Sequence, residues 1–181
     1  MIRIAQDIKA LHPKLKVGVN FLGWKAERAL EESLAAGLDA TWTDSPEVDS
    51  SGCCAPADSI AKTLDQNPGH LFFGSVAFKY QPDEPNPPLA ALNAAKLGMI
   101  PTTSGSATGS PPSANKLSSM KSALGTGPLA AASGIDPSNV GVLGAHLTHI
   151  LVSTGISSSF HSFDQDLLAS LMANLPAIRA Q

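Results

Sequence analysis

Three short polar loops contain the residue types best suited to binding an anion. Each follows an apolar run and precedes a helix-like segment, and each combines glycine with serine or threonine. Backbone N–H groups and hydroxyls at such positions donate to phosphate oxygens, and glycine lets a ligand approach the backbone closely. The candidate phosphate-binding residues are Ser104, Gly105, Thr108, Gly109, Ser133, Gly134, Thr154 and Gly155.

Ordinary turn chemistry is the alternative for these loops, because glycine and serine are frequent where a strand turns into a helix. Three such loops at successive strand ends favour a shared phosphate site. The longest loop is not a nucleotide-binding P-loop, because no Gly-Lys-Ser/Thr follows it.

Two ionisable residues and one amide also follow predicted strands. Lys79 could form a Schiff base or bind an anionic group, and Asp44 could act as an acid or base. Asn20 ends the first predicted strand and is a further ligand-binding candidate. A rim ion pair or simple solvent exposure is the alternative for Lys79 and Asp44, and Glu47 and Asp49 compete with Asp44 for an acid/base role.

These candidates depend on a regular alternation of helices and strands. Hydrophobic periodicity predicts helices over 2–11, 26–36, 56–64, 89–97, 113–124 and 136–145, and a last helix after Asp164. Apolar runs predict six strands, near Val17, Ala40, Phe73, Ile100, Leu129 and Leu151, with the third extending to Phe78. Strands that alternate with helices through short connections form a parallel sheet with crossover helices.

The α/β pattern fits a doubly wound sheet or a closed barrel, and two features favour the barrel. No G-x-G-x-x-G turn opens a first βα unit, and the polar loops follow the last strands, where (β/α)8 TIM barrels bind phosphate. If the last two strands are the seventh and eighth, the first two strands and the first helix are missing. We therefore expect residues 1–181 to form a single partial TIM-barrel domain, with the missing quarter absent or supplied by another chain.

Composition excludes several other classes of function. A net charge of −3 and 5% aromatic residues argue against nucleic-acid binding. The only cysteines, Cys53 and Cys54, are adjacent and read as free thiols, and the sequence predicts no metal site or cofactor. We find no signal peptide and no apolar run long enough to span a membrane, which predicts a cytoplasmic protein.

Several segments together resemble the BtpA-like family of phosphate-binding (β/α) barrels. The resemblance extends from about Ile8 to Leu175 and implies a TIM-barrel fold. Members of that family are linked to photosystem I biogenesis, and others occur among sugar-metabolism proteins. The matching segments are Gly18-Val19-Asn20-Phe21-Leu22, Ser104-Gly105-Ser106-Ala107-Thr108-Gly109 and Ala132-Ser133-Gly134-Ile135-Asp136-Pro137-Ser138-Asn139-Val140.

The sequence therefore predicts a protein that binds a phosphorylated sugar or a nucleotide-like ligand. An isomerase, lyase or transferase reaction would use Lys79 or Asp44 as acid or base. The alternatives are a non-catalytic assembly factor of the photosystem I type and an inactive barrel fragment. An opened barrel also exposes sheet edges, which predicts a homo-oligomer or a partner that covers them.

Overall fold

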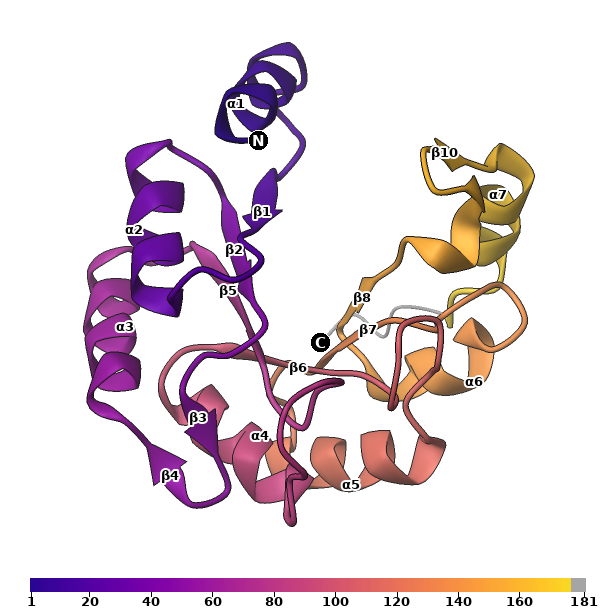
Figure 1. The fold of residues 1–181 in the computed structure, drawn as a ribbon. Helices are drawn as coiled ribbons and strands as arrows, with labels where there is room; N and C mark the ends of the chain where they lie inside the picture. The colour runs from indigo at the N-terminus through magenta and orange to yellow at the C-terminus, as the bar shows by residue number, and fades with distance from the viewer. Residues whose placement is uncertain (177–181) are drawn as a thin grey trace.

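The computed structural model describes residues 1–176, and its centre is one curved sheet of six parallel strands (Figure 1). All six predicted strand regions are present, and their order in the sheet follows the sequence. Six parallel strands with helices on the outside make a partial (β/α)8 barrel, as predicted. The strands are β1 (Gly18–Asn20), β2 (Ala40–Thr43), β5 (Leu71–Ser75), β6 (Ile100–Thr103), β7 (Ala130–Ala132) and β8 (His149–Leu151).

A helix or helical turn connects each sheet strand to the next, and helices also flank both ends of the sheet (Figure 1). The helical segments are α1 (Ile2–Leu11), α2 (Ala26–Ala35), α3 (Ala55–Gln66), α4 (Pro87–Lys96), α5 (Ala114–Leu124), α6 (Val140–Leu143), α7 (Gln165–Ala173) and the 3₁₀ turns η1 (Gly144–His146) and η2 (Thr154–Ile156). None of the helices within residues 1–176 has the length and apolar character needed to cross a membrane.

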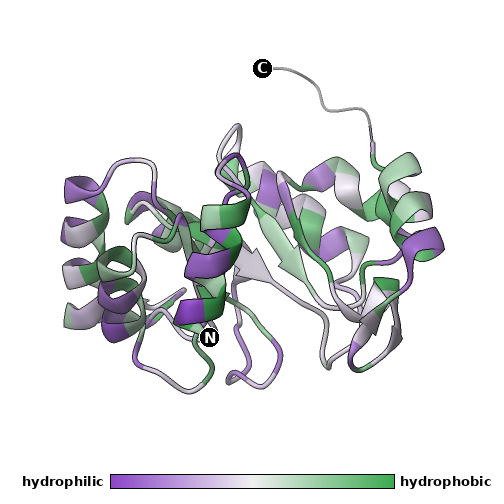
Figure 2. Ribbon diagram, turned by 90° about the horizontal axis from the view of Figure 1, so that it is seen from above, coloured by the Kyte–Doolittle hydropathy of each residue, from purple (hydrophilic) through white to green (hydrophobic). Residues whose placement is uncertain are grey.

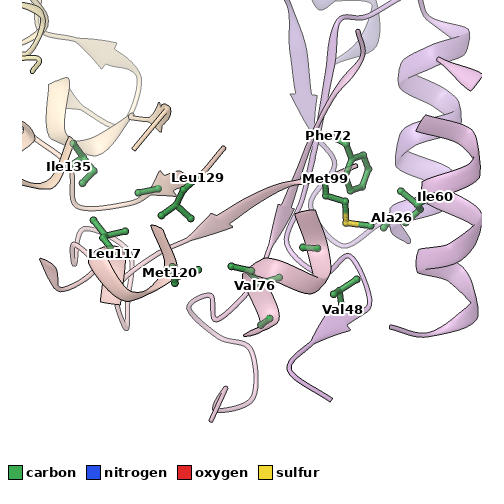
Figure 3. Packing of buried hydrophobic residues seen from close by; sticks show 14 of the residues in the cluster. Ala26, Val48, Ile60, Phe72, Val76, Met99, Leu117, Met120, Leu129 and Ile135 are labelled. Carbon is green, nitrogen blue, oxygen red and sulfur yellow. The ribbon is translucent and has the colours of Figure 1, made fainter. Parts of the chain in front are cut away.

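The main core lies between the convex face of the sheet and the helices. Phe72 of β5 points into it, beside Met99, which precedes β6, and Ile60 of α3 (Figure 3). Leu117 of α5 and Leu129 before β7 extend the same cluster, and both are fully buried. Each such side chain stabilises the fold by about 1.5–3 kcal/mol through burial, so this layer fixes the strand order.

The concave face of the sheet has a smaller apolar cluster. Phe73 follows Phe72 in β5 and points to the opposite side, as successive strand residues do. It packs with Ile100 and Ala130, and its ring meets the His149 imidazole edge-to-face at 5.4 Å between centroids. Because β5 and β8 are separated by β6 and β7, this contact shows that the sheet is strongly curved.

Two short hairpins occur in segments where the sequence predicted neither a helix nor a strand. One pairs β3 (Val48–Asp49) with β4 (Gly52–Cys53), and the other pairs β9 (Ser157–Ser159) with β10 (Ser162–Phe163). Strands of two or three residues are too short to show an alternating pattern. Turn chemistry forms them instead: the Asp49 carboxylate accepts hydrogen bonds from Ser51, which closes the first hairpin.

The predicted helix start at Asp136 is wrong. The Asp136 carboxylate accepts hydrogen bonds from the Ser138 and Asn139 amides, so these residues form a turn. The α-helix begins only at Val140 and lasts one turn before η1. An Asp-Pro pair is compatible with both arrangements, and here the local side-chain bonds favour the turn.

The last helix begins where predicted, but only part of its apolar face is buried. Asp164 caps α7 by accepting from the Asp166 and Leu167 amides. Helical spacing places Leu167, Leu168 and Leu171 on one apolar face, but only Leu171 is buried, whereas Leu167 and Leu168 are exposed. Helical spacing predicts which residues share a face, but it does not show what the face meets.

Candidate functional site

Polar residues follow successive strands on one face of the partial barrel. Asn20 is the last residue of β1, Asp44 follows β2, Ser104 follows β6 and Ser133 follows β7. Thr154, another candidate, opens η2 three residues after the end of β8. Because all six strands are parallel, their carboxyl ends meet at one face, which is where barrel active sites form.

Lys79 lies in a tight loop rather than at the end of a strand. The sequence predicted a strand through Phe78, but β5 ends at Ser75. Ala77 has φ +48° and Tyr80 has φ +65°, which are left-handed conformations that a strand cannot contain. Backbone strain of this kind costs about 1–3 kcal/mol per residue and persists only when surrounding contacts impose it.

Side chains from neighbouring elements impose this conformation on the loop. The Ala77 carbonyl accepts from the Thr103 hydroxyl at 3.0 Å and from the Lys116 ammonium, which also donates to the Ser104 carbonyl at 2.9 Å. The Lys79 amide donates to the Ser104 hydroxyl at 2.8 Å. The β5 loop is therefore fixed to β6, to the residue that follows β6, and to α5.

Gln81 fixes the same loop from the other side. Its Nε2 donates to the carbonyls of Asp44 at 2.6 Å and Ser75 at 2.9 Å. Its Oε1 accepts from the Phe78 amide at 2.9 Å. One side chain thus satisfies three backbone groups and joins the β5 loop to the residue that follows β2.

The Lys79 ammonium reaches across to two other strand-end loops. It donates to the Ser133 hydroxyl at 2.7 Å and to the Thr108 hydroxyl at 3.1 Å. Within residues 1–176 no carboxylate lies within 4.0 Å of the Lys79 ammonium. The ion pairs in this part of the chain are Lys9–Asp39 and Arg28–Glu32. Its two protein partners are neutral hydroxyls, so the positive charge of Lys79 is not neutralised by a neighbouring side chain.

Lys116 and Tyr80 complete the polar environment of this loop. Burial lowers the pKa of the Lys116 ammonium, which donates to the backbone carbonyls of Ala77 and Ser104. The hydrogen bond with Thr108 lowers the pKa of the exposed Tyr80 phenol. A cavity of about 490 Å³ lies between the β5 and β6 loops, with Lys79, Ser104, Ser106 and Lys116 among its lining residues.

Three of the predicted phosphate-loop glycines are in close contact with loop backbone, Gly105 within its own loop and Gly134 and Gly155 with the preceding loop. A Cβ at Gly105 would lie 2.3 Å from the Ser110 carbonyl oxygen. One at Gly134 would lie 2.1 Å from the Pro111 nitrogen, and one at Gly155 would lie 2.0 Å from the Ile135 carbonyl oxygen. Loop packing therefore requires glycine at these positions, whether or not a ligand binds. Gly109 has φ +80° and open space around it.

Asn20 and Asp44 differ from the residues around Lys79 in the hydrogen bonding of their side chains. The Oδ1 atoms of both side chains are buried, and neither has a hydrogen-bond partner among the described residues. Buried acceptors are normally paired, because an unpaired one costs about 1–3 kcal/mol. The two atoms mark the β1–β2 side of the face as a place where hydrogen-bond donors are missing.

A second cavity, of about 400 Å³, lies beside the β3–β4 hairpin. Glu47, Asp49, Asp83 and Glu84 line it together with Cys53. Its acidic lining makes it unsuited to a phosphate. Among the residues that the structure describes, no three histidine, cysteine, aspartate or glutamate side chains gather as metal ligands.

Sequence reasoning missed Lys116, Gln81 and Thr103. Thr103 ends β6 and Gln81 lies two residues after Lys79, but nothing local in the sequence shows that their side chains bond to the backbone of the β5 loop. Lys116 lies in the first turn of α5, three residues after its cap Ser113, and reads there as an ordinary surface lysine. Only the packing of α5 against the strand-end loops brings it to the site.

Comparisons with solved structures show the fold. Phosphoribosylanthranilate isomerase from Thermotoga maritima matches with a TM-score of 0.68 and 16% identity over 96% of this chain and 78% of that chain. A 3-hexulose-6-phosphate synthase matches with a TM-score of 0.70 and 14% identity over 96% and 80%. A 3-keto-L-gulonate-6-phosphate decarboxylase from Vibrio cholerae matches with a TM-score of 0.64 and 13% identity over 96% and 78%.

At these identities the likeness establishes a TIM-barrel fold and no particular activity. The names of all three neighbours contain a phosphorylated compound or a phosphoribosyl group. No family model matches this sequence, and no curated protein sequence matches it. The fold that the resemblance implied is therefore established on structural grounds, whereas membership of the BtpA-like family stays a prediction.

Proposed function

We propose that the strand-end face binds the phosphate group of a small phosphorylated metabolite, with Lys79 as its cationic anchor. The observation that carries this proposal is the Lys79 ammonium, held by the Ser133 and Thr108 hydroxyls with no carboxylate within 4.0 Å in the part of the chain that the structure describes. The strained loop holds the lysine in place before any ligand arrives, so little conformational entropy is lost on binding. The substrates named in the fold neighbours support a phosphorylated sugar or a nucleotide-like compound.

The proposed reaction class is an isomerase, lyase or transferase reaction with Asp44 or Lys79 as acid or base. The Asp44 Oδ1 is buried without a hydrogen-bond partner among the described residues, which supports this role. The hydrogen bond from Gln81 to the Asp44 backbone places this aspartate beside the loop that carries Lys79. The photosystem I role of the BtpA-like family and the inactive-fragment alternative have no contact in the structure that favours them.

Phosphate titration of the Lys79→Met variant tests the anchor. Charge-assisted hydrogen bonds contribute about 1.5–3 kcal/mol, so we expect about 10- to 100-fold weaker binding of inorganic phosphate and ribose 5-phosphate. Binding would be followed by calorimetry and by chemical shifts of the Gly134 and Gly155 amides. Lys62→Met is the matched control, because Lys62 is exposed on α3. Equal affinity of both variants would contradict the proposal.

The acid/base role needs a separate variant. Asp44→Asn preserves the shape of the side chain and removes its capacity to take a proton. We expect unchanged phosphate affinity and a large loss of any turnover detected with a phosphorylated ketose or aldose. A loss of phosphate affinity with unchanged turnover would instead assign Asp44 to binding.

A further inference from the structure

Lys116 is a half-buried amine that the proposed phosphate anchor does not use. It lies in the first turn of α5, and its Nζ donates to the backbone carbonyls of Ala77 and, at 2.9 Å, of Ser104. Figure 2 shows purple, hydrophilic residues along the outer helices, where water hydrates charged groups. Lys116 instead brings its amine to the loops that follow β5 and β6.

The hydrogen bonds of Lys116 leave one direction at its nitrogen without a partner. A lysine nitrogen has four tetrahedral directions, of which one is the bond to Cε and two point here to the carbonyls of Ala77 and Ser104. Among the residues that the structure describes, no third acceptor bonds to this nitrogen. In the neutral amine both N–H groups keep their carbonyls and the lone pair takes the remaining direction, so the nitrogen is held in place with or without its charge.

The surroundings of Lys116 favour the neutral amine. In the described part of the chain no carboxylate lies within 4.0 Å of its nitrogen. Burial lowers the pKa of the ammonium, because the charged form loses hydration. A larger fraction of this amine is therefore nucleophilic than at an exposed lysine. Lysines that are desolvated in this way react with carbonyl compounds to form imines.

The amine borders the cavity of about 490 Å³ between the β5 and β6 loops. Pro111 and Pro112 contribute apolar walls, and Tyr80, which is 80% exposed, lines the side that is open to solvent. A cavity of this volume accommodates a small molecule. Lys79 lines the same cavity, so a phosphate at Lys79 and a carbonyl carbon at Lys116 can belong to one ligand.

Two carboxylates also line this cavity, and they restrict where a phosphate can lie. The Glu84 carboxylate accepts from the backbone amides of Ser50 and Asn86, and Asp83 is exposed. Neither is within 4.0 Å of the Lys116 nitrogen. Their negative charge repels a phosphate, which leaves the side of Lys79 for it.

We propose that Lys116 forms an imine with the carbonyl carbon of a small phosphorylated aldehyde or ketone bound in this cavity. The inference rests on the proposed function only for the phosphate end of the ligand, which Lys79 would bind. The nitrogen lone pair attacks the carbonyl carbon and the nitrogen gives up one proton. The carbonyl oxygen takes up this proton and one more from solvent, and it leaves as water. The product is a protonated imine, whose remaining N–H can still donate to one of the two backbone carbonyls.

The imine gives the two lysines different tasks. Lys79 binds the phosphate, whereas Lys116 is the covalent catalytic residue. A protonated imine withdraws electrons from the neighbouring carbon atom, so a C–H or C–C bond beside it breaks more readily. This chemistry suits the isomerase and lyase reactions of the proposed class.

Reductive trapping tests the imine in the unmodified chain. Sodium cyanoborohydride reduces an imine to a stable secondary amine, and peptide mass spectrometry then identifies the modified lysine. The probes are glycolaldehyde and glycolaldehyde phosphate. We expect about tenfold more adduct at Lys116 than at Lys121, because the cavity positions the carbonyl carbon beside Lys116. Adducts spread over all lysines according to their exposure would overturn the proposal.

Lys121 is the matched comparison for Lys116. It lies on the same helix, is also half-buried and donates to the Gly127 carbonyl at 2.7 Å, but it is not one of the residues that line the cavity.

Arginine substitutions separate the covalent role from a structural one. Lys116→Arg keeps a cation and N–H donors for the two carbonyls, but a guanidinium forms no reducible imine. We expect loss of the adduct in this variant, with circular dichroism unchanged, whereas Lys121→Arg should keep the adduct at Lys116. Total trapping that is equal in the two variants would contradict the proposal. If Lys116→Arg does not fold, the position of the adduct in the unmodified chain still decides.

The two probes separate this inference from the phosphate anchor. The phosphate ester should modify Lys116 about 10- to 100-fold more efficiently than glycolaldehyde, because it gains a charge-assisted hydrogen bond to Lys79. Equal modification of Lys116 by both probes would support the imine and contradict the anchor. Tight binding of inorganic phosphate without any adduct at Lys116 would support the anchor and overturn the imine.

Discussion

The two sides of the strand-end face differ in how completely their polar groups are satisfied. On the β5–β7 side, Lys79, Ser104 and Lys116 form a hydrogen-bonded network that links three strand-end loops. On the β1–β2 side, Asn20 and Asp44 each bury an oxygen that has no partner in the described part of the chain. The sheet differs in the same way at one position: β5, β6 and β7 each pair with a strand on both sides, whereas β1, which ends in Asn20, lies at a free edge.

This comparison shows that one half of the site is organised by the chain alone. The loops after β6, β7 and β8 pack backbone to backbone, with Gly134 and Gly155 at the close approaches. The β1–β2 half lacks the neighbouring strand that a closed barrel would provide. A ligand or a partner that supplies donors there would complete the face, whereas the Lys79 half needs no such help.

The largest expected loss of stability concerns the loop after β7, which packs against the loop after β6. Gly134→Ala places a Cβ 2.1 Å from the Pro111 nitrogen at a residue with φ +69°. Overpacking and backbone strain each cost about 1–3 kcal/mol, so we expect destabilisation by about 3 kcal/mol or more. Thermal unfolding measures it, and about 2–4 °C is lost per kcal/mol for a chain of this size.

Gly109→Ala is the control for Gly134→Ala, because Gly109 has a similar φ of +80° and nothing within 4 Å. Only the left-handed backbone penalty of about 1–2 kcal/mol applies to it. If the two variants unfold at the same temperature, loop packing is not the reason for glycine at position 134.

The second-largest expected loss of stability concerns Gln81, which joins the β5 loop to the residue that follows β2. Gln81→Leu removes the side chain that pairs the backbone groups of Asp44, Ser75 and Phe78. Unpaired buried backbone groups cost about 1–3 kcal/mol each, and solvent reaches some of them, so we expect a loss of about 2–3 kcal/mol. Denaturant unfolding measures this loss. Hydrogen exchange should also accelerate in the 76–81 loop.

Gln6→Leu is the control for Gln81→Leu, because Gln6 makes one exposed bond, to the Ala36 carbonyl. We expect it to change stability by less than about 0.5 kcal/mol. A loss equal to that of Gln81→Leu would show that the strand-end loops do not depend on the Gln81 network.

The smallest effect concerns the opposite end of the sheet. Burial lowers the pKa of His70, whose imidazole bonds to the Thr41 hydroxyl and lies 3.2 Å from the Leu38 carbonyl. The unfolded chain therefore binds a proton more readily than the folded chain. The stability contributed by neutral His70 is complete above pH 6.5 and falls as the pH drops below this value.

The His70→Gln variant separates this contribution from general acid effects. We expect its unfolding free energy to fall less between pH 7 and pH 5 than that of the unmodified chain. Above pH 7 the unfolding free energies of the two proteins should follow parallel curves that differ by a constant amount. A parallel decline of both profiles would mean that His70 does not titrate on unfolding in this range.

The sequence alone determined the order of the six sheet strands and the polar residues at the ends of β1, β2 and β7. Apolar runs such as the one around Phe72 and Phe73 predict buried strands because burial stabilises them wherever they pack. Helix caps such as Asp164 and Ser113 depend on neighbours two or three residues away, so the sequence alone indicates them. Parallel topology then places Asn20, Asp44 and Ser133 on one face.

Only the tertiary structure decided which of these residues act together. Lys79 meets Ser133 across 54 positions of sequence, and Lys116 reaches the β5 loop from a helix 39 positions away. Contacts over such separations depend on the curvature of the sheet, which no local pattern encodes. Ile4 and Leu168 are exposed, although each helix has the spacing of a buried face. A helical pattern shows that a face is apolar, whereas its burial depends on a neighbouring element.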